Sequence, residues 1–180
     1  MSREADLIRG AKLRRDEFRV CVDPDLVDEY ERLLGEQAAA REAARTSLAG
    51  GAVLDLQEQI DGLREEMEAA TVTLVLQALP RREYRSLVDK HPPGKDADGK
   101  VIPRDERAGV AYFEFYDELA RRSIVSPQLD AETLDILLDD KLTDGQWQEL
   151  TSLCNRLNLT SVDVPFLPAG SPSRRRSSAK

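Results

Sequence analysis

Cysteine, histidine and tryptophan are scarce in this chain, whose 180 residues include two Cys, one His and one Trp. The cysteines, Cys21 and Cys154, are distant in sequence, and the chain has no Cys-x-x-Cys pair or Cys/His cluster. Zinc sites are usually built from such clusters, and small secreted domains from dense cysteine frameworks. The pattern therefore argues against a metal site and fits a protein of a reducing compartment.

Long apolar runs are missing as well. The first 20 residues lack the apolar run that a secretory signal needs, and no stretch approaches the roughly 18 apolar residues of a membrane-spanning helix. Aromatic residues make up 5% of the chain and charged residues 33%, so any single core is modest. We expect a soluble intracellular protein that does not bind a membrane.

Basic side chains are outnumbered, because the chain has 34 acidic and 26 basic residues and a formal net charge of −8. Proteins that bind duplex nucleic acid usually carry the opposite sign of charge, since most of their affinity comes from phosphate contacts. The composition therefore predicts no nucleic-acid partner.

Residues that could carry out chemistry do not form a recognisable catalytic pattern. His91 precedes two prolines and has no nucleophile paired with it in sequence, and Cys154 lies among leucines. The chain has no glycine-rich phosphate loop. Asp135 and Asp139 share a predicted helix face, but without a second acidic cluster we interpret them as solvated. We expect no enzyme activity, no cofactor and no metal.

Two heptad patterns flank Gly50-Gly51, a pair that favours a turn over a helix interior. Apolar or small residues recur at alternating spacings of three and four on both sides. The positions are Leu26, Tyr30, Leu33, Gln37, Ala40 and Ala44 before the glycines, and Val53, Leu56, Ile60, Leu63 and Met67 after them. The simplest fold is an antiparallel, coiled-coil-like helical hairpin over residues 21–70. The alternative is a seam that also recruits another chain.

The remaining segments complete a mainly α prediction: an N-terminal hairpin plus a small C-terminal helical domain. We interpret residues 1–20 as a flexible or helical arm. The β-branched run at residues 71–77, TVTLVLQ, favours one short strand, with a helix continuation as the alternative. Residues 71–165 are expected to form the compact domain, with a polar loop at 92–106. Residues 166–180 resemble a disordered basic tail.

The single tryptophan, Trp147, lies in a predicted helix that begins with Thr143 or Asp144 as its N-cap. Leu150, Leu153 and Leu157 continue its face. Trp147 is either a core anchor packed on the helices expected at 109–125 and 131–138, or an exposed contact for a partner, since tryptophan is enriched in both settings.

Two loose motifs resemble a known family when they are taken together with the hairpin. The first comprises Leu79, Pro80, Arg82, Tyr84, Leu87, His91, Pro92 and Pro93, and the second Asp144, Gly145, Trp147, Leu150, Asn158, Asp163, Val164 and Pro165. Over about residues 22–167 the chain resembles the tail assembly chaperones of tailed phages that infect actinobacteria. The likeness depends on the order and spacing of residues, because the motifs contain no catalytic residue.

The resemblance implies a non-virion protein of the host cell cytoplasm. Such chaperones bind the long, aggregation-prone tape measure protein until the tail tube forms around it. The family often makes a second, longer product by ribosomal frameshifting, so the implied partners are the tape measure protein and a longer frameshifted form of this chain. A homo-oligomer is a further possibility.

No binding residues carry over from the family, so candidates come from the chain's own apolar positions. They are Leu56, Ile60, Leu63 and Met67 in the second heptad, together with Trp147. The competing interpretation is a virion tail structural or connector protein that assembles through its hairpin.

Overall fold

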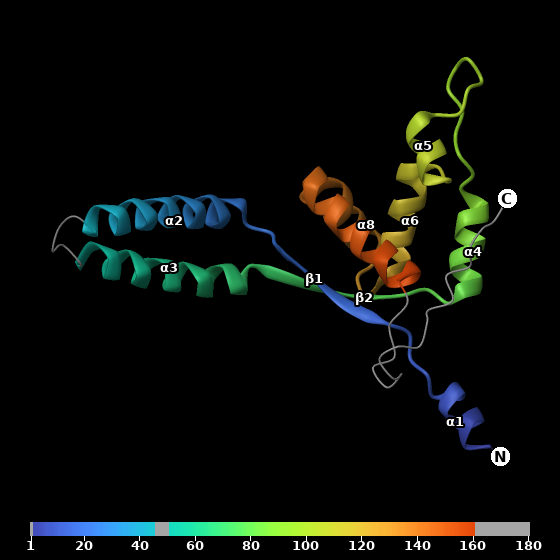
Figure 1. Ribbon diagram of the computed structural model, residues 1–180, viewed down its shortest axis with the longest axis horizontal. Coiled ribbons are helices and arrows are strands. Elements are labelled where there is room, and N and C mark those ends of the chain that lie inside the picture. The colour runs from blue at the N-terminus through green and yellow to red at the C-terminus, as the bar shows by residue number, and fades with distance from the viewer. Residues whose placement is uncertain (1, 46–50, 161–180) are drawn as a thin grey trace, which may run out of the picture.

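The computed structural model describes residues 2–45 and 51–160, which form a mainly helical protein with a small antiparallel sheet (Figure 1). The elements in chain order are α1 (Arg3–Arg9), β1 (Arg15–Cys21), α2 (Pro24–Ala44), α3 (Gly51–Ala69), β2 (Thr71–Gln77), α4 (Arg81–Lys90), α5 (Pro103–Ala108), α6 (Tyr112–Ser123), β3 (Ile124–Ser126), α7 (Ala131–Asp135), the π-helix η1 (Ile136–Lys141) and α8 (Asp144–Leu159).

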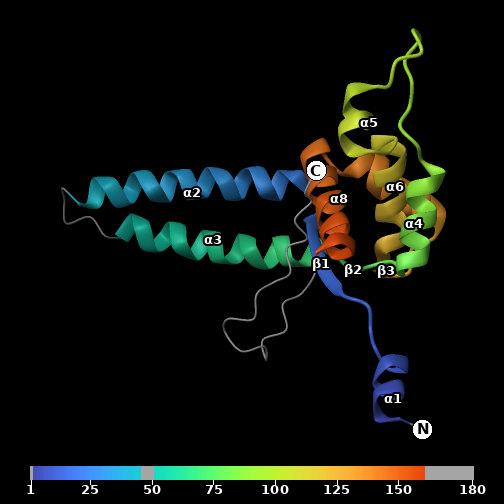
Figure 2. The ribbon, with the colours of Figure 1, turned by 45° about the vertical axis from the view of Figure 1, so that its right-hand side comes forward.

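The helices α2 and α3 lie side by side and project from the sheet end of the molecule (Figures 1 and 2). Asp23 caps α2 by accepting a hydrogen bond from the Asp25 backbone N–H at 3.1 Å, and Pro24 occupies the first turn. All eleven predicted heptad positions are buried or half-buried. The expected turn at Gly50 falls in residues 46–50, outside the described residues, and Gly51 begins α3.

The sheet has the order β1-β2-β3, with both pairings antiparallel. The strand predicted at residues 71–77 is confirmed as β2. The prediction of an arm over residues 1–20 needs correction, because Arg15–Cys21 forms β1 and pairs with the whole of β2. Phe18 and Val20 are the reason, since they alternate with charged residues and lie 5% and 4% exposed against the core. Only Arg3–Arg9 of the arm is helical.

The core lies between one face of this sheet and the helices α4, α6 and α8. β1 and β2 contribute alternate side chains, and α6 and α8 pack on each other and on the sheet. The most deeply buried members are Leu74, Leu76, Leu87, Phe115, Leu119, Ala120, Leu150 and Cys154. The α2–α3 pair buries a separate small group consisting of Leu33, Gln37 and Ile60.

The polar loop predicted at 92–106 ends earlier than expected, because Pro103–Ala108 forms α5. Pro103 suits the first helical turn, and Gly109 ends the helix with a positive φ of 73°. The buried Asp105 carboxylate accepts hydrogen bonds from the backbone N–H groups of Gly94 and Tyr112, at 3.0 and 3.1 Å. Asp105 thus ties the loop, α5 and the start of α6 together.

Two further segments differ from the predicted helices. The apolar stretch at 109–125 divides into α6 and the short strand β3, which pairs with β2. The segment expected as one helix after Asp130 starts as α7, capped by the Asp130 carboxylate at 2.7 Å from the Thr133 N–H, and continues as the π-helix η1. The structure therefore has two strands beyond the one that the sequence predicted.

Candidate functional site

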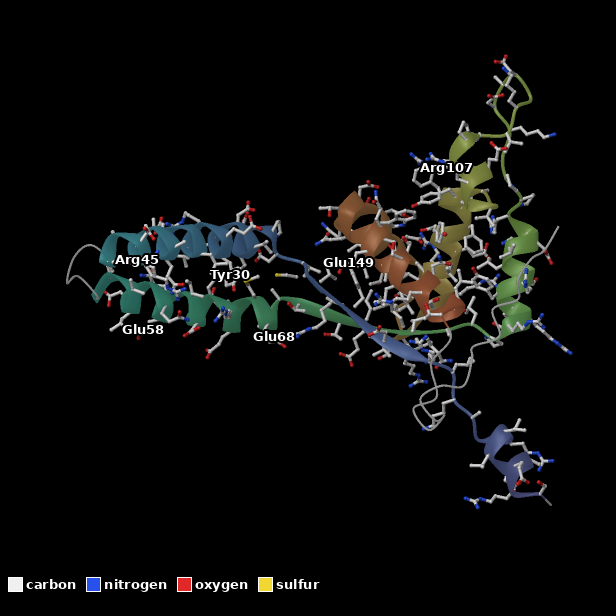
Figure 3. All side chains as sticks on the ribbon, in the orientation of Figure 1. Tyr30, Arg45, Glu58, Glu68, Arg107 and Glu149 are labelled. Atoms are coloured by element: carbon white, nitrogen blue, oxygen red, sulfur yellow. The ribbon has the colours of Figure 1, made fainter. Side chains whose placement is uncertain are left out.

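A surface groove of about 460 Å³ lies where α5, α6 and α8 meet. α5 contributes Arg104, Arg107 and Ala108, α6 contributes Tyr112, Phe113 and Tyr116, and α8 contributes Asp144, Trp147 and Gln148. Figure 3 marks the α5 side of this region with Arg107. A concave site lined by aromatic rings with a few charged groups is the usual form of a ligand or partner site.

Trp147 is placed in the groove by the start of α8. Thr143 caps this helix by accepting from the Gln146 N–H at 3.3 Å, and the Gln146 side chain accepts from the Thr143 N–H at 2.9 Å. Trp147 follows in the first turn and is only 9% exposed. Its ring lies 6.2 Å from that of Tyr112 and 5.9 Å from that of Phe113, centroid to centroid. Trp147 therefore packs on α6 and borders the groove at the same time.

The arginines of α5 form the cationic wall. The guanidinium carbon of Arg104 lies 4.5 Å from the ring centroid of Phe113 and 5.4 Å from that of Tyr112, which is cation–π geometry. Arg107 donates from Nε to the Pro103 carbonyl at 3.2 Å. Over residues 2–45 and 51–160, neither side chain takes part in an ion pair with a carboxylate.

Sequence reasoning missed this groove, apart from Trp147. The available signal was the run GVAYFEFYDEL, in which Phe113 lies off the helix face that Tyr112, Phe115 and Tyr116 share at spacings of three and four. Phe115 is 2% exposed, whereas Phe113 is 52% exposed. The arginines gave no signal, because α5 was not predicted.

The other sequence candidates lie on α3, which projects away from α8 with α2 beside it (Figures 1 and 2). Ile60 is 1% exposed, so it packs inside the pair, while Leu56, Leu63 and Met67 are half-buried. The five candidates therefore belong to two separate surfaces.

Met67 borders an open surface hollow of about 450 Å³ at the base of the pair. There Arg64 donates to the Tyr30 hydroxyl at 3.1 Å and lies over its ring, and Figure 3 shows Tyr30 facing α3.

His91 joins α4 to α6. Its Nε2 lies 2.7 Å from a carboxylate oxygen of Glu118, which also accepts from Lys90 at 2.6 Å and from Arg122. The hydrogen bond from Lys90, followed by those from His91 and Arg122, lowers the pKa of Glu118 to about 2 against the opposing effect of burial. These contacts give His91 a structural role.

Asp135 and Asp139, which the sequence analysis interpreted as solvated, are held by an arginine. Arg121 donates to Asp117 at 2.7 Å, to Asp139 at 3.2 Å and to Asp135. Within the part of the chain that the structure describes, no group of three or more His, Cys, Asp or Glu side chains is arranged to hold a metal ion.

The two cysteines are free thiols in different settings. Burial raises the pKa of Cys154 to about 11, which keeps this thiol protonated and unreactive near neutral pH. Cys21 is half-buried and donates to the Asp23 carbonyl at 3.5 Å.

Among the residues with described positions, no helix combines the length and apolar character that crossing a bilayer requires. No protein-family model, curated protein or solved structure matches this chain.

Proposed function

We propose that this protein is a phage tail assembly chaperone that acts in the host cell cytoplasm. It binds the tape measure protein, keeps it soluble during tail morphogenesis, and does not become part of the virion. It acts by binding alone and needs no cofactor. A longer frameshifted form of the chain is its second partner, and association with further copies of itself is compatible with this role.

The two motifs that resemble the chaperone family lie in contact, which supports their reading as one unit. The Leu79 backbone N–H, from the first motif, donates to Oδ1 of Asn158, from the second, at 2.9 Å. The Tyr84 hydroxyl reaches Asn155, three residues before Asn158, at 3.3 Å. Asp163, Val164 and Pro165 of the second motif lie outside the described residues.

The observation that carries the proposal is the partly open apolar seam of α2 and α3, which we interpret as a coiled-coil-like hairpin. Leu56, Leu63 and Met67, which are seam positions of α3, remain half-buried. Amphipathic partner helices bind such apolar stripes at spacings of three and four residues. A tape measure protein, as a long helical client, would find apolar contacts along the arm.

The charge of the same arm suits a protein that keeps an aggregation-prone client in solution. α2 and α3 together contain twelve acidic and three basic side chains, a net charge of −9, whereas the whole chain has −8. A net charge far from zero opposes association between like complexes. The arm therefore combines an apolar stripe with a repulsive outer surface.

Co-expression with the tape measure protein tests the proposal. We expect the tape measure protein to be soluble with this chain and insoluble without it. Met67→Glu places a charge on the half-buried seam and should reduce that solubility, with circular dichroism to check that the variant is folded. Leu54→Glu adds the same charge on the opposite, exposed face of α3 and is the matched control. If the tape measure protein is equally soluble with and without this chain, the proposal is wrong.

The competing function is a virion tail structural or connector protein, because the same open seam could accept another virion subunit. Quantitative mass spectrometry of infected-cell lysate and of purified virions separates the two. A chaperone is abundant in the lysate and absent from the virion, whereas a structural protein is present in the virion at a fixed ratio to the other tail proteins.

A further inference from the structure

The groove between α5, α6 and α8 has chemistry that the proposed tail-assembly role does not use. Arg104 is stacked on Phe113, with its guanidinium carbon 4.5 Å from the ring centroid. A stacked guanidinium keeps its N–H edge free, and that edge matches a carboxylate in a paired hydrogen-bond geometry. Arg107 stands on the same helix and, like Arg104, is exposed and has no ion-pair partner in residues 2–45 or 51–160.

The apolar part of the groove also leaves a large surface exposed. Phe113 leaves 52% of its surface in water although its ring lies 5.9 Å from that of Trp147 and 5.4 Å from that of Tyr112. Aromatic and arginine side chains in concave sites dominate the affinity of protein interfaces, because they bury a large area and make directed contacts. An apolar group placed here would cover Phe113 beside two available cations.

We propose that this groove binds a short protein segment in which a large apolar side chain stands next to carboxylates. The apolar side chain lies against Phe113 and Trp147, and the carboxylates pair with Arg104 and Arg107. The proposal is independent of the tail-assembly function, since it concerns a different surface from the α2–α3 seam.

A nucleic-acid strand is the other ligand class that uses stacked aromatic rings and arginines. The opposite wall of the groove argues against it, because Asp144 presents a carboxylate there, with one oxygen accepting from Gln148 Nε2 at 2.7 Å. A phosphate backbone would meet this negative charge and the net charge of −8 of the chain. A peptide avoids that repulsion, since its acidic side chains can face α5 while neutral backbone faces Asp144.

The first experiment uses a fluorescein-labelled peptide, acetyl-GDEFLDEG-amide, titrated with the whole protein and followed by fluorescence anisotropy. The emission of Trp147, the only tryptophan, reports on the groove in a parallel titration with unlabelled peptide. We expect saturable binding that weakens when salt is raised about tenfold, because the ion pairs are solvent-exposed. The same peptide with Lys in place of Asp and Glu should bind at least about tenfold more weakly.

Variants locate the site. Arg104→Gln combined with Arg107→Gln should weaken binding about tenfold or more, as should Phe113→Ala. Arg82→Gln on α4, an exposed arginine outside the groove, is the matched control and should bind like the parent. Thermal melting checks each fold, and if Phe113→Ala is unstable the double arginine variant, at two exposed positions, decides alone.

Three results would overturn the proposal. The first is an absence of saturation up to about 1 mM protein, which corresponds to negligible specific affinity. The second is unchanged affinity in the double arginine variant. The third is stronger binding of the lysine peptide or of a twelve-nucleotide oligothymidine, either of which would assign the groove to another ligand class.

Discussion

Gln37 and Gln57 form a hydrogen bond across the α2–α3 pair, with Gln37 Nε2 donating to Gln57 Oε1 at 2.8 Å. Gln37 is 4% exposed, so this amide sits among the apolar seam positions and not at its edge. A polar pair in a helical seam favours one register of the two helices, because a shift breaks this hydrogen bond and leaves the buried Gln37 amide without a partner.

Gln37→Ala should therefore lower the free energy of unfolding by about 1 kcal/mol, since it removes the hydrogen bond to the half-buried Gln57, whose Nε2 still donates to Asp61 at 2.9 Å. Replacing both glutamines with leucine should restore or exceed the parent stability, because apolar packing replaces the amide pair. Urea unfolding followed by circular dichroism measures both. A double variant as unstable as Gln37→Ala would show that the amide pair itself supplies the stability.

Ile60→Asp tests the packing of the arm. A carboxylate at this position, which is 1% exposed, should lower the free energy of unfolding by several kcal/mol, on the order of 3 or more. Adding Leu63→Asp should lower it further, because Leu63 is half-buried in the same seam. Leu54→Asp is the control on the same helix, and at 72% exposure it should change stability little. Equal melting temperatures for Ile60→Asp and Leu54→Asp would contradict the observed packing.

Trp147→Ala should lower the free energy of unfolding by about 3–5 kcal/mol, because the indole is 9% exposed and packs on the α6 rings. Trp147→Phe should recover part of that loss. Chemical denaturation measures it, and tape measure solubility is scored beside it. If Trp147→Ala melts like the parent but no longer keeps the tape measure protein soluble, Trp147 is primarily a partner contact.

The lowered pKa of Glu118 should make the stability of the fold sensitive to acid. This pKa is lowered in the folded protein from its ordinary value of 4.5 to about 2, first by the hydrogen bond from Lys90. A carboxyl group with a lowered folded pKa adds stability above its unfolded pKa, and this contribution is lost as pH falls through the folded value. Stability should therefore fall between about pH 4.5 and pH 2. Glu118→Gln should be less stable at neutral pH and lose less on acidification, as measured by thermal melting across that range.

The sequence predicted those elements whose secondary structure depends mainly on the residues of the segment itself. β2 was found with its observed ends because Thr71, Val72, Thr73 and Val75 favour extended backbone. The heptad positions were assigned correctly to the inner side of α2 and α3, since period alone determines a helix face.

Elements that depend on distant residues were missed. β1 has only Phe18, Val20 and Cys21 among charged neighbours, and it becomes a strand through pairing with residues of β2 that lie 50 to 62 positions away in sequence. The groove depends on α5, which is held by Asp105 through the backbone of Gly94 and Tyr112. Nothing in the local sequence of α5, PRDERA, predicts that Asp105 accepts these two backbone hydrogen bonds.

The central claim is that this chain keeps the tape measure protein from aggregating. Its most direct test is light scattering of purified tape measure protein, diluted from denaturant into buffer with increasing amounts of the purified chain. We predict that scattering falls with dose and is largely suppressed near a fixed molar ratio, while Met67→Glu suppresses less than Leu54→Glu. Scattering that is unchanged at a large excess of the folded chain would contradict the claim.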